Sequence, residues 1–140
     1  FGDAEVFGDA EVFGDAEVFG DAEVSGNAWV FGDARVFGDA EVFGDAEVSG
    51  NAWVFGDARV FGDARVFGDA KVKLTSDYLV VGPVGDSNRF VTATKSNGKV
   101  VAGCFLGTVA EFKVAVKAKY PKGALYYAVI ELIKMYLSTK

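Results

Sequence analysis

The first 72 residues consist of twelve consecutive hexapeptides, and this period of six constrains the fold more than any other feature of the chain. Ten units read FGDAxV, with Glu, Arg or Lys at the fifth position, and two read SGNAWV. Six is not a helical period, and a Gly in every unit would cost a helix about 1 kcal/mol each time relative to Ala. The repeat therefore predicts short strands joined by corners.

Each hexapeptide predicts one strand and one corner. Along Ala-Glu-Val-Phe, the side chains of Ala and Val point to one side, whereas those of Glu and Phe point to the other. Gly-Asp, or Gly-Asn in the two variants, forms the corner because these residues tolerate positive φ. The inward side then holds only Val and Ala, so we expect a solid interior with no pocket for a ligand.

An aliphatic residue is followed four positions later by a small one throughout residues 1–72, as in Val6 with Ala10 and Val66 with Ala70. This pattern resembles the hexapeptide-repeat family of left-handed parallel β-helices. The resemblance implies a triangular β-solenoid in which three hexapeptides make one coil, so that the twelve units form four coils.

Many proteins of that family are acyltransferases, and related ones are zinc carbonic anhydrases. These enzymes use histidine as a base or as a zinc ligand, and loops that interrupt the coils build their substrate clefts. The present chain contains no His, and its repeat has no insertion. We therefore expect no enzymatic activity, no catalytic residue, no cofactor and no metal ion.

Three hexapeptides per coil predict that outward residues stack in rows. The expected rows of fifth-position residues are Glu5, Glu23, Glu41 and Arg59; Glu11, Trp29, Glu47 and Arg65; and Glu17, Arg35, Trp53 and Lys71. Stacked glutamates could hold a cation, but a hard cation needs converging oxygens, and a solvated face is the simpler interpretation. In the third row, Trp53 lies between two cations at a spacing that permits cation–π contacts.

Nine Phe residues, from Phe7 onward, point outward by the same alternation, in rows that Ser25 and Ser49 interrupt. A monomer does not normally expose so much contiguous apolar surface. Two interpretations stay open: the rings stack on one another as ladders, or an unbroken row is a docking surface. The expected interaction surface comprises Phe19, Phe37, Phe55, Trp29 and Trp53.

The two parts of the chain carry opposite charge. Residues 1–72 hold 4 Lys and Arg against 16 Asp and Glu, a net charge of −12, whereas residues 73–140 hold 10 against 4, a net charge of +6. We expect a homo-oligomer. Its contacts could involve the Phe rows, the oppositely charged ends of two molecules or the uncapped first coil. We favour lateral packing of the Phe rows, because those contacts repeat at every coil. Neither nucleic acid nor a membrane is an expected partner, because the lysines of residues 113–122 suit a solvated helix face and no apolar run approaches a membrane span.

Residues 73–140 predict a small α+β domain that caps the tube. Three strands are expected in YLVVGPVG, RFVTATKS and KVVAGC, with Gly-Pro and Ser-Asn-Gly as turns. A capping box at Thr108 to Glu111 opens a helix that runs to about Tyr120, where Pro-Lys-Gly ends it. A second helix, residues 124–137, is apolar nearly all round, and we expect the last coil to cover it.

Within this domain, VVGPVGDSNRF and GCFLGTVAEF resemble a small C-terminal domain that is attached to similar repeats in bacterial and phage proteins of unassigned role. The resemblance covers about residues 77–137 and implies no activity. Cys104, the only cysteine, has no His to activate it, so we expect a structural thiol. One Cys, no signal segment and a start inside the repeat favour a fragment or processed product located in the cytoplasm or a phage particle.

The sequence therefore predicts a non-enzymatic structural or self-associating solenoid. The alternative is a binding module, in which the C-terminal domain recognises a protein partner and the solenoid serves as a rigid spacer.

Overall fold

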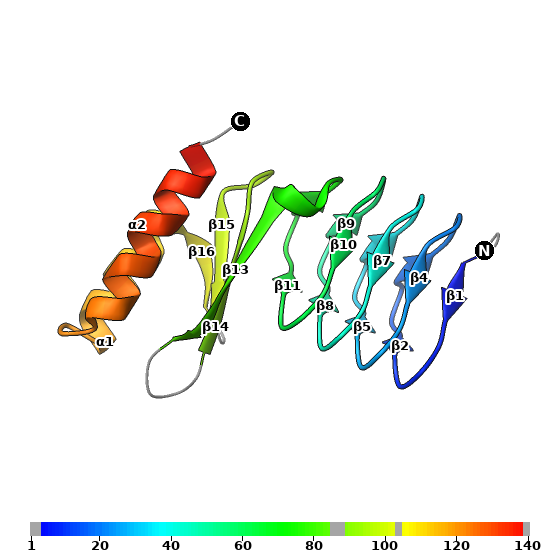
Figure 1. Cartoon of the computed structure of the whole chain (residues 1–140), viewed down its shortest axis with the longest axis horizontal. Helices are drawn as coiled ribbons and strands as arrows, with labels where there is room; N and C mark the ends of the chain where they lie inside the picture. Colours follow the sequence, from blue (N-terminus) through cyan, green and yellow to red (C-terminus); the bar gives the residue numbers. More distant parts are fainter. Residues whose placement is uncertain (1–3, 85–88, 103–104, 139–140) are drawn as a thin grey trace.

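A computed structural model describes residues 4–84, 89–102 and 105–138. The repeat forms a β-solenoid of about four turns, in which short parallel strands stack into three four-stranded sheets (Figure 1). Each strand covers the fifth and sixth residues of a hexapeptide. The strands are β1 (Glu5–Val6), β2 (Glu11–Val12), β3 (Glu17–Val18), β4 (Glu23–Val24), β5 (Trp29–Val30), β6 (Arg35–Val36), β7 (Glu41–Val42), β8 (Glu47–Val48), β9 (Trp53–Val54), β10 (Arg59–Val60), β11 (Arg65–Val66) and β12 (Lys71–Val72).

The pairing of these strands confirms the predicted rows. We call the three sheets face A (β1, β4, β7, β10), face B (β2, β5, β8, β11) and face C (β3, β6, β9, β12). On face A, Glu23 pairs with Glu5 on one side and with Glu41 on the other. Faces B and C align their fifth-position residues in the orders Glu11, Trp29, Glu47, Arg65 and Glu17, Arg35, Trp53, Lys71.

The extended segment is shorter than the four residues expected, because the corner begins at Phe. The N–H of Ala34, for example, donates back to the carbonyl of Phe31 at 3.4 Å, which closes a four-residue turn. Hydrogen bonds between coils nevertheless continue through the corner, since the N–H of Asp9 donates to the carbonyl of Gly26 at 2.9 Å. Each hexapeptide is therefore tied to the next coil along most of its length.

The interior of the tube is a continuous column of Val and Ala, as predicted. From Ala22 to Val72, every inward Ala and Val side chain is fully buried. Close packing of small and β-branched side chains leaves the tube solid between its three faces. The core of the tube thus follows from the repeat, because each hexapeptide from residue 7 onward contributes one Ala and one Val to it.

The C-terminal part is a four-stranded antiparallel sheet with two helices. After the short 3-10 helix η1 (Thr75–Asp77), the strands in sheet order are β13 (Tyr78–Val84), β14 (Arg89–Thr94), β15 (Lys99–Ala102) and β16 (Phe105–Thr108). Helix α1 spans Val109–Lys119 and helix α2 spans Ala124–Ser138, which confirms both predicted helices. No helix in the described ranges has the length and apolar character needed to cross a membrane.

Two strand assignments in this part are wrong. The sequence predicts three strands, and the structure has four, because Phe105–Thr108 pairs antiparallel with β15. Gly82 and Pro83, expected to form a turn, lie inside β13, where the pairing with β14 shifts register between Val81 and Val84. Proline has no N–H to donate to a ladder, and an edge strand or a bulge tolerates it.

The prediction that α2 lies on the last coil is also wrong. The sheet stands between the tube and the helices (Figure 1). Alternate residues of β13 divide between two cores: Tyr78 and Val80 pack against the Val and Ala column, whereas Leu79 and Val81 pack with the helices. The apolar side of α2, including Ile130, is buried against the second of these cores. One sheet therefore covers the tube with one face and the helices with the other.

Candidate functional site

Face C carries an unbroken aromatic ladder. Phe19, Phe37 and Phe55 stack ring on ring, with centroids 5.0 and 5.1 Å apart and interplanar angles of 3° and 9°. The Trp53 ring meets Phe37 and Phe55 edge-on at 5.8 and 6.3 Å. All three Phe residues are half-buried, so the ladder covers part of its own surface and leaves the rest open to solvent. Four of the five residues of the predicted interaction surface thus lie together.

Two cations flank the Trp53 ring, as predicted. The Nζ of Lys71 lies 4.8 Å from the ring centroid, and the guanidinium carbon of Arg35 lies 5.7 Å from it. Such contacts contribute about 0.5 to 1 kcal/mol each at exposed sites. Face C therefore presents an aromatic stripe with positive charge beside it, although the tube as a whole is acidic.

Trp29, the fifth residue of the predicted surface, lies on face B, apart from the others. Trp29 is 43% exposed, and its ring lies edge-on to those of Phe13 and Phe31, with centroid distances of 6.2 and 6.5 Å. Those two Phe rings stack with centroids 5.0 Å apart, and Ser49 takes the next place in the row. Within the described ranges, three consecutive stacked rings occur on face C alone.

The acidic rows hold ion pairs with the cations of the last coil. The Nε of Arg59 lies 3.3 Å from a carboxylate oxygen of Glu41, and the Nε of Arg65 lies 3.3 Å from one of Glu47. Both pairs are partly exposed, where an ion pair contributes about 0 to 1 kcal/mol. Among the residues that the structure describes, no three His, Cys, Asp or Glu side chains are grouped so that they could hold a metal ion.

Side-chain hydroxyls complete the last coil where it meets the sheet. In earlier coils the N–H of a fifth-position residue donates to a carbonyl of the next coil, as Glu41 does to Ala58 at 3.0 Å. In the last coil, the corresponding N–H on each of the three faces donates to a hydroxyl oxygen of the C-terminal part. The pairs are Arg59 with Thr75 (3.1 Å), Arg65 with Thr92 (3.1 Å) and Lys71 with Ser96 (2.7 Å).

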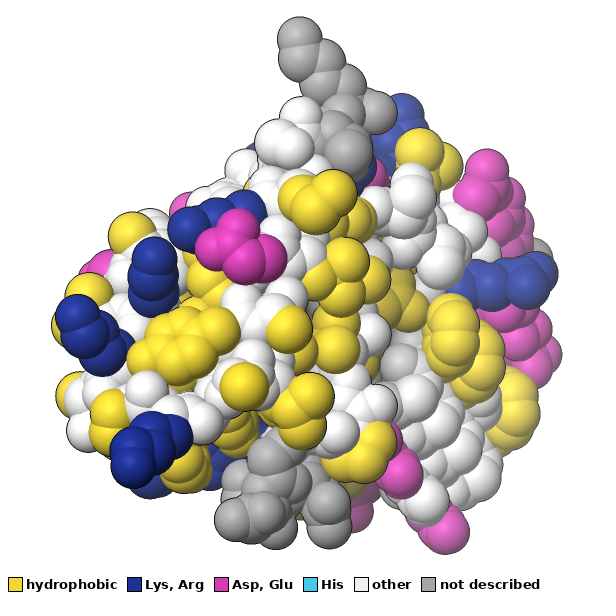
Figure 2. All heavy atoms as spheres, turned by 60° about the vertical axis from the view of Figure 1, so that its left-hand side comes forward, with side chains coloured by type: hydrophobic (Ala, Val, Ile, Leu, Met, Phe, Trp, Pro, Cys, Tyr) yellow, Lys and Arg dark blue, Asp and Glu magenta, His cyan; other side chains and the backbone are white. Residues whose placement is uncertain are grey.

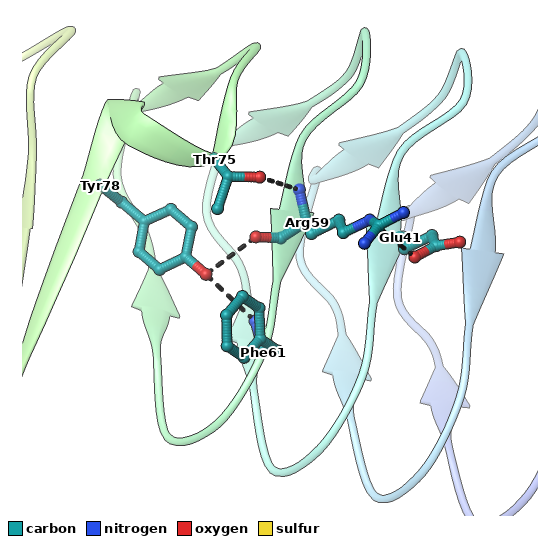
Figure 3. A network of polar contacts seen from close by, with 5 residues as sticks. All are labelled: Glu41, Arg59, Phe61, Thr75 and Tyr78. Atoms are coloured by element: carbon teal, nitrogen blue, oxygen red, sulfur yellow. Dashed lines mark hydrogen bonds and ion pairs between the residues drawn. The ribbon is translucent and has the colours of Figure 1, made fainter.

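The hydroxyl of Tyr78 binds two backbone groups of the last coil, which no further coil follows (Figure 3). It donates to the carbonyl of Arg59 at 2.8 Å and accepts from the N–H of Phe61 at 3.4 Å. Burial raises the pKa of the Tyr78 phenol. Burial also raises the pKa of Tyr136, whose hydroxyl donates to the carbonyl of Ser76 at 2.7 Å. Both phenols are therefore held neutral at the junction between the tube and the sheet.

We expect the free energy of unfolding to fall as pH rises above about 10, because unfolding releases protons that the folded state holds on these two tyrosines. Their stabilisation is complete below the unfolded pKa and is lost as pH rises through the folded pKa. Tyr78→Phe should lower stability at neutral pH by about 1 to 2 kcal/mol, since two backbone groups lose their partner. Chemical unfolding from about pH 8 to 11 measures both effects. The double variant Tyr78→Phe/Tyr136→Phe should show a shallower decline, and an unchanged slope would contradict this account.

The hexapeptide pattern does not predict the hydroxyls at the junction. The one signal for them is the alternation in RFVTAT, where the buried residues Thr92 and Thr94 alternate with the buried residues Val91 and Ala93. Val91 and Ala93 pack with the helices, so the two Thr side chains face the tube. A Thr at every second position of a covered strand thus indicates a polar contact with the end of another sheet.

No protein-family model, curated protein or solved structure matches this chain. Cys104 and Gly103, at the start of the motif that ends at Phe112, lie outside the described residues. The rest of that motif packs within the C-terminal part, where the rings of Phe105 and Phe112 lie 5.3 Å apart.

Proposed function

We propose that the protein is a non-enzymatic structural solenoid that associates with further copies of itself through face C. The observation that carries the proposal is the three-ring ladder of Phe19, Phe37 and Phe55 on the outside of a tube with a closed Val and Ala core. A solid core supplies shape and stiffness, whereas small-molecule sites are concave. Aromatic side chains that remain accessible supply contact area at a low cost in conformational entropy, and here the contact repeats along the tube.

We also propose that the tube is a hexapeptide-repeat, left-handed β-helix, and that about residues 77–137 form the domain that accompanies such repeats. Three faces per coil and a corner Gly with φ between +62° and +69° support this assignment. The described coils follow one another without an inserted loop, which is the element that builds a substrate cleft in the enzymes of that family. This regularity supports a structural function.

Phe37→Ser tests face C, because the hexapeptide already accepts Ser at this position in Ser25 and Ser49. Loss of the central ring should weaken self-association about tenfold or more, since Phe37 contacts both neighbouring rings. Sedimentation equilibrium of the folded variant measures the change. Phe43→Ser is the matched control on face A, where the described ladder has two rings, and it should weaken association less than about twofold. Equal losses in the two variants would contradict the assignment to face C.

The second candidate function is a binding module whose C-terminal part recognises a protein partner. Exposed apolar side chains on the helices favour it: Leu125, Leu132 and Met135 on α2, and Val114 on α1. Figure 2 shows hydrophobic side chains gathered at this end of the molecule, with Lys and Arg among them. Leu132→Lys in the full chain separates the candidates. If self-association depends on face C, the variant should associate as the unaltered chain does. If the helices bind the partner, the variant should lose partner binding.

A further inference from the structure

Strand β13 forms one edge of the antiparallel sheet, with β14 on its other side. Just before the strand, the carbonyl of Asp77 accepts from the N–H of Lys95 at 2.9 Å, so these two residues form a hydrogen-bonded pair. Bonded and non-bonded pairs alternate in an antiparallel ladder. Tyr78 and Val80, which pair with β14 at the non-bonded positions, therefore direct their backbone N–H and C=O groups toward the open edge. Among the described strands, none pairs with that edge.

An apolar cleft lies on each face of the sheet along this edge. On the side of the tube, a cleft of about 360 Å³ is lined by Phe61, Val80 and Phe90, among others. On the side of the helices, a cleft of about 200 Å³ is lined by residues that include Pro83 and Leu125. A strand added to the edge would direct successive side chains to opposite faces. The two clefts thus suit a segment in which consecutive residues are apolar, because neighbouring side chains enter opposite clefts.

The tube-side cleft also reaches the one corner of the last coil that is open. At every other described corner glycine of the tube, an added Cβ would meet another atom within 4 Å, whereas at Gly62 it would meet none. Asp63, the next residue, lines the same cleft, is exposed, and makes no ion pair with any residue that the structure describes. Asp45 takes the equivalent place one coil earlier. This acidic corner favours a positive charge at the end of the bound segment.

We propose that the free edge of β13 binds an extended peptide segment of a protein partner, with a run of consecutive apolar residues and a Lys or Arg that reaches Asp63. The segment adds a fifth strand to the sheet, so that its backbone bonds to Tyr78 and Val80 and its side chains enter the two clefts. The site belongs to the second candidate function and does not depend on association through face C. An unprotected strand edge otherwise promotes aggregation, and a bound strand removes that liability.

The test begins with a displayed library of random dodecapeptides selected on the full chain. We expect enriched sequences that hold a run of consecutive apolar residues and carry a basic residue near one end. Val80→Pro removes an N–H that faces the open edge and leaves the bonded positions at Leu79 and Val81, so it should reduce retention of the selected peptide at least tenfold. Asp63→Asn should weaken binding of that peptide about three- to tenfold, and Asp33→Asn, at a corner of another coil, should leave it unchanged.

Amide hydrogen exchange on the unaltered chain gives a second measurement that does not depend on a variant folding. Binding of the selected peptide should slow exchange at Tyr78 and Val80 at least tenfold and change Leu79 and Val81 little, since those amides are already bonded. Several results would overturn the proposal: no enriched sequence, enrichment with a spacing of three and four residues that suits a helix on α2, or unchanged exchange at Val80. A dimer that protects Val80 without peptide would assign the edge to a second copy and overturn it as well.

Discussion

Val36→Asp should unfold the entire repeat, with a loss of about 5 kcal/mol or more in the free energy of unfolding. Val36 is fully buried on β6, and it lies in register between Val18 and Val54 of the neighbouring coils. The surrounding column of Val and Ala offers no polar partner for a carboxylate. Because each coil of a solenoid is stabilised by its neighbours, the damage should spread through the tube. Circular dichroism during denaturant unfolding measures the loss.

Arg35→Asp is the matched control, since it introduces the same carboxylate one residue earlier in the same strand. The Arg35 side chain is exposed, and the contact that it loses is the one with Trp53. We expect a loss of about 1 kcal/mol or less. Similar losses at positions 35 and 36 would mean that the inward and outward faces of the strand have been exchanged.

Gly44→Ala should destabilise the tube by about 2 to 5 kcal/mol, through two separate causes. Gly44 has a φ of +68°, which is costly for a residue with a Cβ. An added Cβ would also lie 2.9 Å from the backbone nitrogen of Gly62 in the next coil, so the stacked corners would have to separate. Thermal and denaturant unfolding of the purified variant measure the sum of both effects.

Gly62→Ala separates the two causes of that loss. Gly62 occupies the same place in its hexapeptide with a φ of +65°, but an added Cβ there meets no atom within 4 Å. The variant should therefore show the backbone cost alone, about 1 to 2 kcal/mol. If Gly44→Ala cost no more than Gly62→Ala, the close stacking of the corners would not contribute to stability.

The repeat could be predicted in detail because its period is exact in the sequence and leaves one choice of register. Once three hexapeptides form a coil, residue 35 must stack on residue 17 and beneath residue 53, and the structure has this order. The contacts of Trp53 with Arg35 and Lys71 follow from the same spacing. The edge-on contacts between Trp53 and the Phe rings depend on rotamers, which the period does not determine.

The C-terminal part was harder to predict because its sequence has no repeat, so no period determines which surfaces of its strands and helices meet. The apolar character of α2 indicates that the helix is buried, but it does not indicate which surface buries it. The strand at Phe105–Thr108 has four residues and runs directly into α1, so no turn signal separates the two. The hydroxyl groups of Thr75, Thr92 and Ser96 act only where they meet the end of the tube, and sequence spacing does not reveal that contact.

The mass of the full chain in solution tests the central claim, that face C makes this solenoid self-associate, most directly. Light scattering at high micromolar concentration should be recorded in about 20 mM and about 1 M salt, since added salt screens charge but strengthens apolar contact. We predict a mass above that of one chain that holds or rises in high salt. A mass that falls in high salt would assign association to the oppositely charged parts of the chain, and a monomer in both conditions would contradict the claim.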